Sequence, residues 1–166
     1  TPPKTPVALT PLQPNEATAV VMVGEHRGIG LHNLLWILRT FPNHFKNFIF
    51  VSVGIVDVES FSAKKELTTM QENTNEMLDY FVNYCQQQGL AAKGFAAYGT
   101  DPTEKLTRLS KKIIKEFPHS LFFASKLIFS KDNWITRLLH NETAVMLQRR
   151  LHLLGVQLVI LPMKIE

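Results

Sequence analysis

Five apolar runs alternate with helical patterns along this chain, and the alternation restricts its fold more than any other feature. The run that begins at Phe48 is almost continuously apolar, which is typical of a parallel strand covered on both faces. Strands that alternate with helices predict βαβ units, and right-handed crossovers then favour the strand order 3-2-1-4-5. We therefore expect a three-layer α/β domain around a five-stranded, mostly parallel sheet. The runs cover about residues 18–23, 48–56, 91–98, 120–127 and 156–161.

The segments between the runs have apolar residues at helical spacing. Asp101-Pro102-Thr103-Glu104 supplies a cap, a proline at the first position and a glutamate at the third, which together indicate a helix start. Gly89 and Gly155 each follow a helical pattern and are expected to end it. The expected helical segments are residues 31–41, 63–88, 102–117, 134–139 and 142–154.

The chain has 166 residues, which suits one globular domain, and 45% of them are apolar. Five of its nine prolines lie in the first 14 residues. We predict a proline-rich linker over residues 1–15 and a single α/β domain over residues 16–166. Because the first residue is Thr1, we expect an excised domain, with proteolytic processing as the alternative. The lone Cys85 cannot form an internal disulfide and is expected to be a buried thiol.

A glycine-rich turn joins the first strand to the first helix, with the spacing Gly-x-x-x-Gly-x-Gly. Backbone N–H groups at such a helix start can hold a phosphate. We name Gly24, Arg27, Gly28, Gly30 and His32 as candidate ligand-binding residues. In the alternative interpretation, the glycines only permit a tight turn and close helix packing.

The turn is similar to the nucleotide turn of short-chain dehydrogenases, but two features differ. Val23 stands where that family has threonine, and the Tyr-x-x-x-Lys motif is absent from the sequence. The turn therefore indicates an α/β fold more strongly than it indicates hydride transfer.

The predicted strand order places a second loop, residues 125–133, beside the glycine turn at the point where the winding of the sheet reverses. Nucleotide-binding universal stress proteins share this order, and they resemble one another in Gly-x-x-Gly-(nine residues)-Gly-Ser/Thr after the fourth strand. This chain has no glycine between Gly99 and Gly155, and bulky residues such as Phe129 and Trp134 occupy the region instead. We therefore expect no ATP binding of the usual kind and no cofactor.

The sequence holds little that suggests catalysis. Asp57 and Glu59 follow the second strand, where an acidic residue is commonly a helix cap or, in dinucleotide folds, a ribose ligand. The six histidines have no short metal-ligand spacing, and a Gly-x-Ser-x-Gly elbow is absent. We expect a non-catalytic protein without a metal site.

Basic residues outnumber acidic ones between residues 105 and 150. This half of the chain either forms ordinary solvated helix faces or contacts an anionic membrane surface. No aromatic stacking platform interleaves with the basic residues, so we expect no nucleic acid as a partner.

Several segments in order resemble the soluble C-terminal domain of bacterial amino-acid permeases of the amino acid–polyamine–organocation superfamily. Cation–chloride cotransporters carry a related domain and are the nearest alternative. The resemblance implies a universal-stress-protein-like α/β domain on the cytoplasmic face of the inner (plasma) membrane, as part of an integral membrane protein, and it supplies no catalytic residues. The segments are residues 24–32, 41–48, 51–57, 140–144 and 148–151.

The resulting hypothesis is a regulatory or assembly domain that forms a homodimer or docks on the transmembrane part of the same transporter. Its candidate interface residues are Trp134, Leu138, Arg149 and Arg150. The competing hypothesis is a nucleotide-binding module, universal-stress-like or NAD(P)-binding, that uses the turn from Gly24 to Gly30. A free-standing stress protein without nucleotide is a third possibility.

Overall fold

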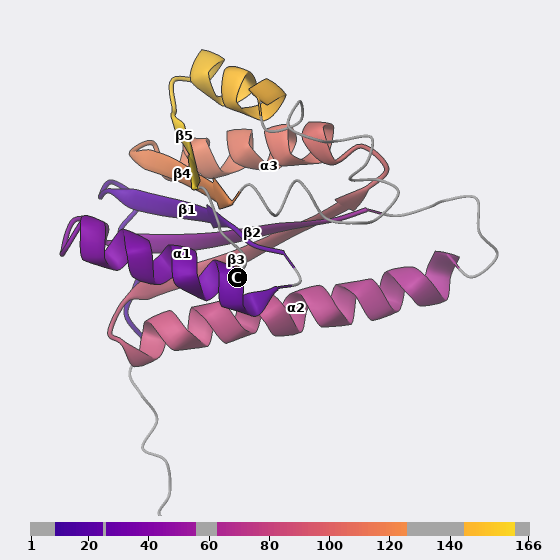
Figure 1. The fold of residues 1–166 in the computed structure, drawn as a ribbon, viewed down its shortest axis with the longest axis horizontal. Coiled ribbons are helices and arrows are strands. Elements are labelled where there is room, and N and C mark those ends of the chain that lie inside the picture. The colour runs from indigo at the N-terminus through magenta and orange to yellow at the C-terminus, as the bar shows by residue number, and fades with distance from the viewer. Residues whose placement is uncertain (1–8, 25, 56–62, 126–144, 162–166) are drawn as a thin grey trace, which may run out of the picture.

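The computed structural model describes residues 9–24, 26–55, 63–125 and 145–161. The described strands are β1 (Thr18–Met22), β2 (Asn47–Ile55), β3 (Ala91–Gly99), β4 (Ser120–Ser125) and β5 (Leu158–Leu161). The labelled helices are α1 (Arg27–Thr40), α2 (Ala63–Gln87) and α3 (Pro102–Glu116) (Figure 1). A further helix covers residues 145–153, just before β5.

The strands form one five-stranded sheet in the order β3-β2-β1-β4-β5, and each neighbouring pair is parallel. β1 lies at the centre, where Val20 is level with Ile49 of β2 and with Phe122 of β4. α1 and α2 cover one face of the sheet, and α3 and the helix over residues 145–153 cover the other (Figure 1). The predicted three-layer fold and its strand order are confirmed.

Two hydrophobic clusters, one on each face of the sheet, make up the core. Side chains alternate between faces along a strand, so Ala19 and Val21 of β1 pack towards α1 and α2, whereas Val20 and Met22 pack towards α3. Each of these four side chains is at most 2% exposed. A sheet covered on both faces therefore explains why the strand sequences are continuously apolar rather than alternating.

The helix ends predicted from Asp101, Gly89 and Gly155 are found where expected. The Asp101 carboxylate accepts a hydrogen bond from the backbone N–H of Glu104 at 3.2 Å and so caps α3. Gly89 and Gly155 have φ values of 75° and 87°, the left-handed conformation that glycine adopts at low cost after a helix. β5 begins at Leu158, two residues later than predicted, because the backbone N–H of Val156 bonds to the Leu151 carbonyl at the end of the preceding helix, 3.1 Å away.

The buried amide of Asn47 ties the lead-in segment to the sheet. Its side chain accepts a bond from the Gln13 N–H and donates one to the Gln13 carbonyl, both at 2.7 Å, and donates another to Thr18 Oγ1 at 2.9 Å. The backbone N–H of Thr10 bonds to Gln86 Oε1 of α2 at 2.9 Å. Residues 10–13, in the segment predicted as a linker, are thus bonded to the domain.

α2 is a 25-residue helix, so its length is about 37 Å. Its exposed side is polar, and its apolar residues face the sheet. Within the described residues, no helix combines the length and the apolar character needed to cross a membrane.

Candidate functional site

The carboxyl ends of β1 and β4 lie side by side where the winding of the sheet reverses, which is where α/β sheets commonly bind ligands. The glycine turn leaves β1 at this point, and Ser125 ends β4 beside it. The turn is short: the backbone N–H of Val23 still bonds to the Val51 carbonyl at 2.9 Å, and α1 begins at Arg27. Gly24 is partly buried between these two elements.

Two of the three candidate glycines lie inside the first turn of α1 rather than in a loop. The N–H groups of Ile29 and Gly30 bond to the His26 carbonyl at 3.1 and 3.4 Å. Neither Gly28 nor Gly30 has a positive φ, so neither is required by backbone conformation. His26 is the N-cap residue but makes no side-chain capping bond, and the first turn contains no acidic residue.

Gly30 is required by packing. A β-carbon at this position would lie 2.5 Å from Phe81 Cζ of α2 and 3.1 Å from Val23 Cγ1, closer than packed atoms normally approach. The missing side chain therefore lets α1 pack directly on α2 and β1. Gly28 differs, because a β-carbon there would meet nothing within 4 Å. Close helix packing, the alternative explanation of the glycine spacing, thus accounts for Gly30 but not for Gly28.

The candidate anion ligand Arg27 is engaged with α2. Its guanidinium carbon lies 5.0 Å from the centroid of the Tyr80 ring, and its Nη2 atom lies 4.0 Å from Glu76 Oε1. The Arg27 side chain is 46% exposed, so the ion pair contributes about 1 kcal/mol or less to stability. His32, the other candidate, is exposed on α1.

Asn33 is a buried polar residue that the sequence analysis did not name. It is fully buried on α1, and its side-chain nitrogen and oxygen have no hydrogen-bond partner among the described residues. Asn33 lies one helical turn before Trp36, whose ring centroid is 6.4 Å from that of Phe123 on β4. Ser125 follows Phe123 by two residues and is therefore on the same face of β4. The unpaired amide thus lies in the layer between α1 and the carboxyl end of β4.

The signal that could have identified Asn33 is its context. All residues of the segment Leu31–Ile37 are apolar except His32 and Asn33, and Asn33 is the one with an amide side chain. Such a residue inside a buried helix is unfavourable unless its amide finds a partner.

The second predicted loop lies largely outside the described residues. So do the interface candidates Trp134 and Leu138 and the acidic residues Asp57 and Glu59. The structure therefore does not test these predictions.

The other two interface candidates, Arg149 and Arg150, point in different directions from the helix over residues 145–153. Arg150 is half-buried, and its Nη1 atom lies 3.5 Å from Thr107 Oγ1 of α3. Arg149 is exposed and lines a shallow groove of about 450 Å³ with Gln148, His152, Leu153 and Gln157. The two arginines therefore do not form a single basic pair.

Cys85 is buried, as predicted. Burial raises the pKa of its thiol from 9.0 to about 12, so the reactive thiolate is scarce at neutral pH. Among the residues that the structure describes, no three His, Cys, Asp or Glu side chains are grouped so as to hold a metal ion.

Comparison with known proteins gives a match in structure alone. No family model matches the sequence, and no curated protein matches it. The fold is similar to the crystal structure of a protein from the universal stress protein family from Burkholderia pseudomallei, with a TM-score of 0.59. That match has 16% sequence identity and covers 89% of this chain and 96% of the other. The chain therefore has a universal-stress-protein-like α/β fold.

Proposed function

We propose that this chain is a non-catalytic regulatory or assembly domain of a membrane transporter for amino acids. The related cation–chloride cotransporters are the alternative parent. The proposal places the domain on the cytoplasmic face of the membrane, with the transmembrane part of the same transporter as its partner. Its family assignment rests on the sequence resemblance, because neither the fold nor the comparisons bear on a transporter origin.

One structural observation carries the non-catalytic part of the proposal. The glycine turn is the strongest indication of a small ligand in the sequence, yet two of its candidate residues are engaged in contacts with α2. Gly30 accommodates Phe81, and Arg27 contacts Tyr80 and Glu76. A domain whose anion-binding turn is occupied in this way is more suited to contacts between proteins than to chemistry on a nucleotide.

The position of β5 at the edge of the described sheet and the groove beside it support homodimer formation. β5 lies at the edge of the described sheet, and its four residues are all apolar, two of them buried and two half-buried. The Gln157 carbonyl bonds to β4, so by alternation the Leu158 carbonyl points to the open edge, where Gln148 Nε2 donates to it at 3.0 Å. Leu153, on the adjacent groove, is 84% exposed. An edge strand next to such an exposed leucine is a suitable surface for a second copy.

Fractionation of the source cells tests the transporter assignment. An epitope tag is placed at the chromosomal locus within the segment that encodes this chain. We expect the tag in the carbonate-washed membrane fraction, on a polypeptide much larger than the 18.9 kDa of this chain. A tagged product of about chain size in the soluble fraction would contradict the assignment and favour a free-standing stress protein.

A nucleotide-binding module remains the second candidate function, and Asn33 favours it. An amide with two unpaired polar atoms, buried between α1 and the end of β4, could be satisfied by a ligand that enters at the α1 N-terminus. Such a ligand would also meet the positive end of the α1 dipole, which has no acidic residue in its first turn.

Thermal unfolding with ATP, ADP, NAD and NADPH separates the two candidate functions. A ligand at 100-fold its dissociation constant would stabilise the chain by about 2.7 kcal/mol. The transporter-domain proposal expects no stabilisation by any of the four. Stabilisation that disappears in Asn33→Leu would instead establish the nucleotide-binding module.

A further inference from the structure

The outward face of α3 is cationic. The helix has five basic residues and two acidic ones among its 15 residues. Leu106, Leu109 and Ile113 form its buried stripe. Arg108, Lys111 and Lys115 recur at i, i+3 and i+7 on the opposite side and are all exposed.

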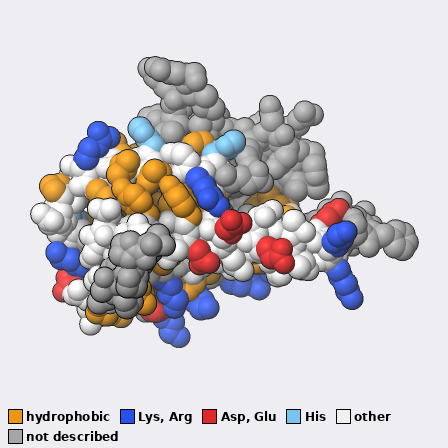
Figure 2. Space-filling view, turned by 90° about the horizontal axis from the view of Figure 1, so that it is seen from below, with side chains coloured by type: hydrophobic (Ala, Val, Ile, Leu, Met, Phe, Trp, Pro, Cys, Tyr) orange, Lys and Arg blue, Asp and Glu red, His pale blue; other side chains and the backbone are white. Residues whose placement is uncertain are grey.

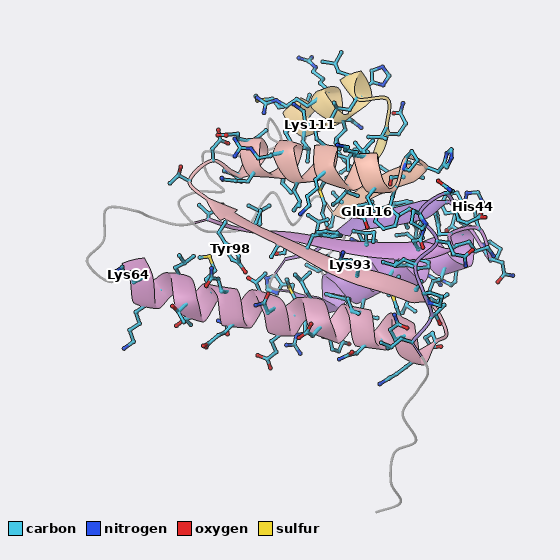
Figure 3. All side chains as sticks on the ribbon, turned by 180° about the vertical axis from the view of Figure 1, so that it is seen from behind. His44, Lys64, Lys93, Tyr98, Lys111 and Glu116 are labelled. Atoms are coloured by element: carbon cyan, nitrogen blue, oxygen red, sulfur yellow. The ribbon has the colours of Figure 1, made fainter. Side chains whose placement is uncertain are left out.

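The charge continues from α3 onto the edge strand β3. Lys93 Nζ of β3 and Lys112 Nζ of α3 lie 4.9 and 5.8 Å from the centroid of the Phe95 ring. The half-buried ring thus holds two ammonium groups near each other at the junction of strand and helix. Figure 3 shows Lys93 on β3 and Lys111 on α3 above it. We call the surface formed by Lys93, Arg108, Lys111, Lys112 and Lys115 the cationic face.

Most of this charge has no ion-pair partner among the described residues. Arg108 pairs with Glu104 at 3.0 Å, but none of the four lysines forms an ion pair with a described residue. On the other side of the sheet, α2 carries four acidic residues and only two lysines, both in its first turn. Acidic side chains follow α2 in Figure 2. The charges of α2 and α3 are thus separated across the sheet.

We propose that the cationic face binds the phosphate groups of an anionic lipid bilayer. Lysine ammonium groups without a described carboxylate partner are attracted to such a surface even where the protein has no binding pocket. Each lysine adds to the affinity. The groove described above is lined by residues of the helix over residues 145–153 and by Gln157, and none of these lysines lines it.

Nucleic acid fits the cationic face less well than lipid. The large hydrophobic side chains exposed among the described residues are all aliphatic or methionine. Phe95 is the aromatic residue within the face, and its ring already contacts two lysines. Bases therefore find no free stacking platform here, whereas lipid phosphates need none.

Cosedimentation of the 166-residue chain with vesicles tests this inference. One set of vesicles is phosphatidylcholine with about 30% phosphatidylserine, and the other is phosphatidylcholine alone, because only anionic lipid supplies the attraction. We expect binding to the first set only, with a loss of affinity in high salt. Lys111→Glu with Lys115→Glu should weaken binding at least about tenfold.

A matched control separates the face from net charge. Lys64→Glu with Lys65→Glu makes the same change in charge on α2, at two exposed positions, and should keep binding within about twofold. Circular dichroism checks that both double variants fold, and Lys111→Gln with Lys115→Gln replaces the first variant if it does not. Equal binding to both vesicle sets, equal losses in the two double variants, or binding of oligouridylate in preference to vesicles would each overturn the inference.

The inference deepens the proposed function, since a transporter domain works beside lipid, and it rests on that function for its setting. Its experiment uses the chain and vesicles alone. If the chain fails to bind vesicles, the result of the cell fractionation is unaffected. If the tagged product is soluble, the result of the vesicle experiment is unaffected. The two failures are therefore distinguishable.

Discussion

At the scale of single residues, two glycines in the same helical turn have opposite roles. A β-carbon at Gly30 would press on buried Phe81, whereas one at Gly28 would enter open space. Gly30→Ala should therefore lower the free energy of unfolding by about 1 to 3 kcal/mol, through overpacking. Gly28→Ala should raise it by up to about 1 kcal/mol, because alanine is the better helix former. Urea unfolding of both variants measures the difference, and equal effects of the two would refute the packing role of Gly30.

Cys85 gives stability a pH dependence at the alkaline end. Burial raises the thiol pKa from 9.0 to about 12 in the folded chain. Above pH 9 the unfolded chain releases this proton and the folded chain keeps it, so the contribution is fully present below pH 9 and is lost as pH rises towards 12. Unfolding of the parent at about pH 8 and about pH 10 should show a fall about 1 kcal/mol larger than in Cys85→Ala. An identical fall in the variant would place the thiol in contact with water.

The residue scale also shows what sequence could not predict. The spacing of Gly24, Gly28 and Gly30 is visible in the sequence, but the partner of Gly30 is Phe81, 51 positions away. Whether such glycines hold a phosphate or admit a neighbouring helix depends on that contact, and nothing local encodes it. For the same reason Asn33 was not recognised, because its burial comes from the packing of α1 on the sheet.

At the scale of elements, the sequence predicted the helices and strands better than it predicted the roles of single residues. Strands that are covered on both faces, a proline and an acidic cap at the start of α3, and glycines after two helices are local signals with local causes. They were sufficient for the order β3-β2-β1-β4-β5, because right-handed crossovers leave few alternatives. The predicted start of β5 was wrong. The apolar side chain of Val156 is typical of a strand, but its backbone N–H bonds to the last turn of the preceding helix.

The edge of β5 depends on one side chain from a neighbouring element. Gln148 donates to the Leu158 carbonyl on the open side of the strand. Gln148→Ala should lower the free energy of unfolding by about 1 kcal/mol, the usual loss for one hydrogen bond. Amide hydrogen exchange of β5 should quicken more than that of β1, which is paired on both sides. Unchanged exchange in β5 would show that the bond does not hold the edge.

At the scale of the whole molecule, the sheet separates surfaces of different character. The α2 side is acidic, the α3 side is cationic, and the β5 edge has a groove with the exposed Leu153 beside it. In a dimer paired through the two β5 edges, a two-fold axis perpendicular to the sheet would turn both α3 layers to the same side. Such an assembly would present two cationic faces to one bilayer.

The central claim is that this chain associates with a second copy of itself beside β5, and its most direct test is sedimentation equilibrium over a range of protein concentrations. We expect the parent chain to have the mass of two chains, and Leu153→Glu to have the mass of one because it places a charge in the β5 interface. Leu9→Glu, at a position 76% exposed and remote in sequence from β5, is the control and should stay dimeric. A parent chain that remains monomeric at the highest concentration would contradict the claim.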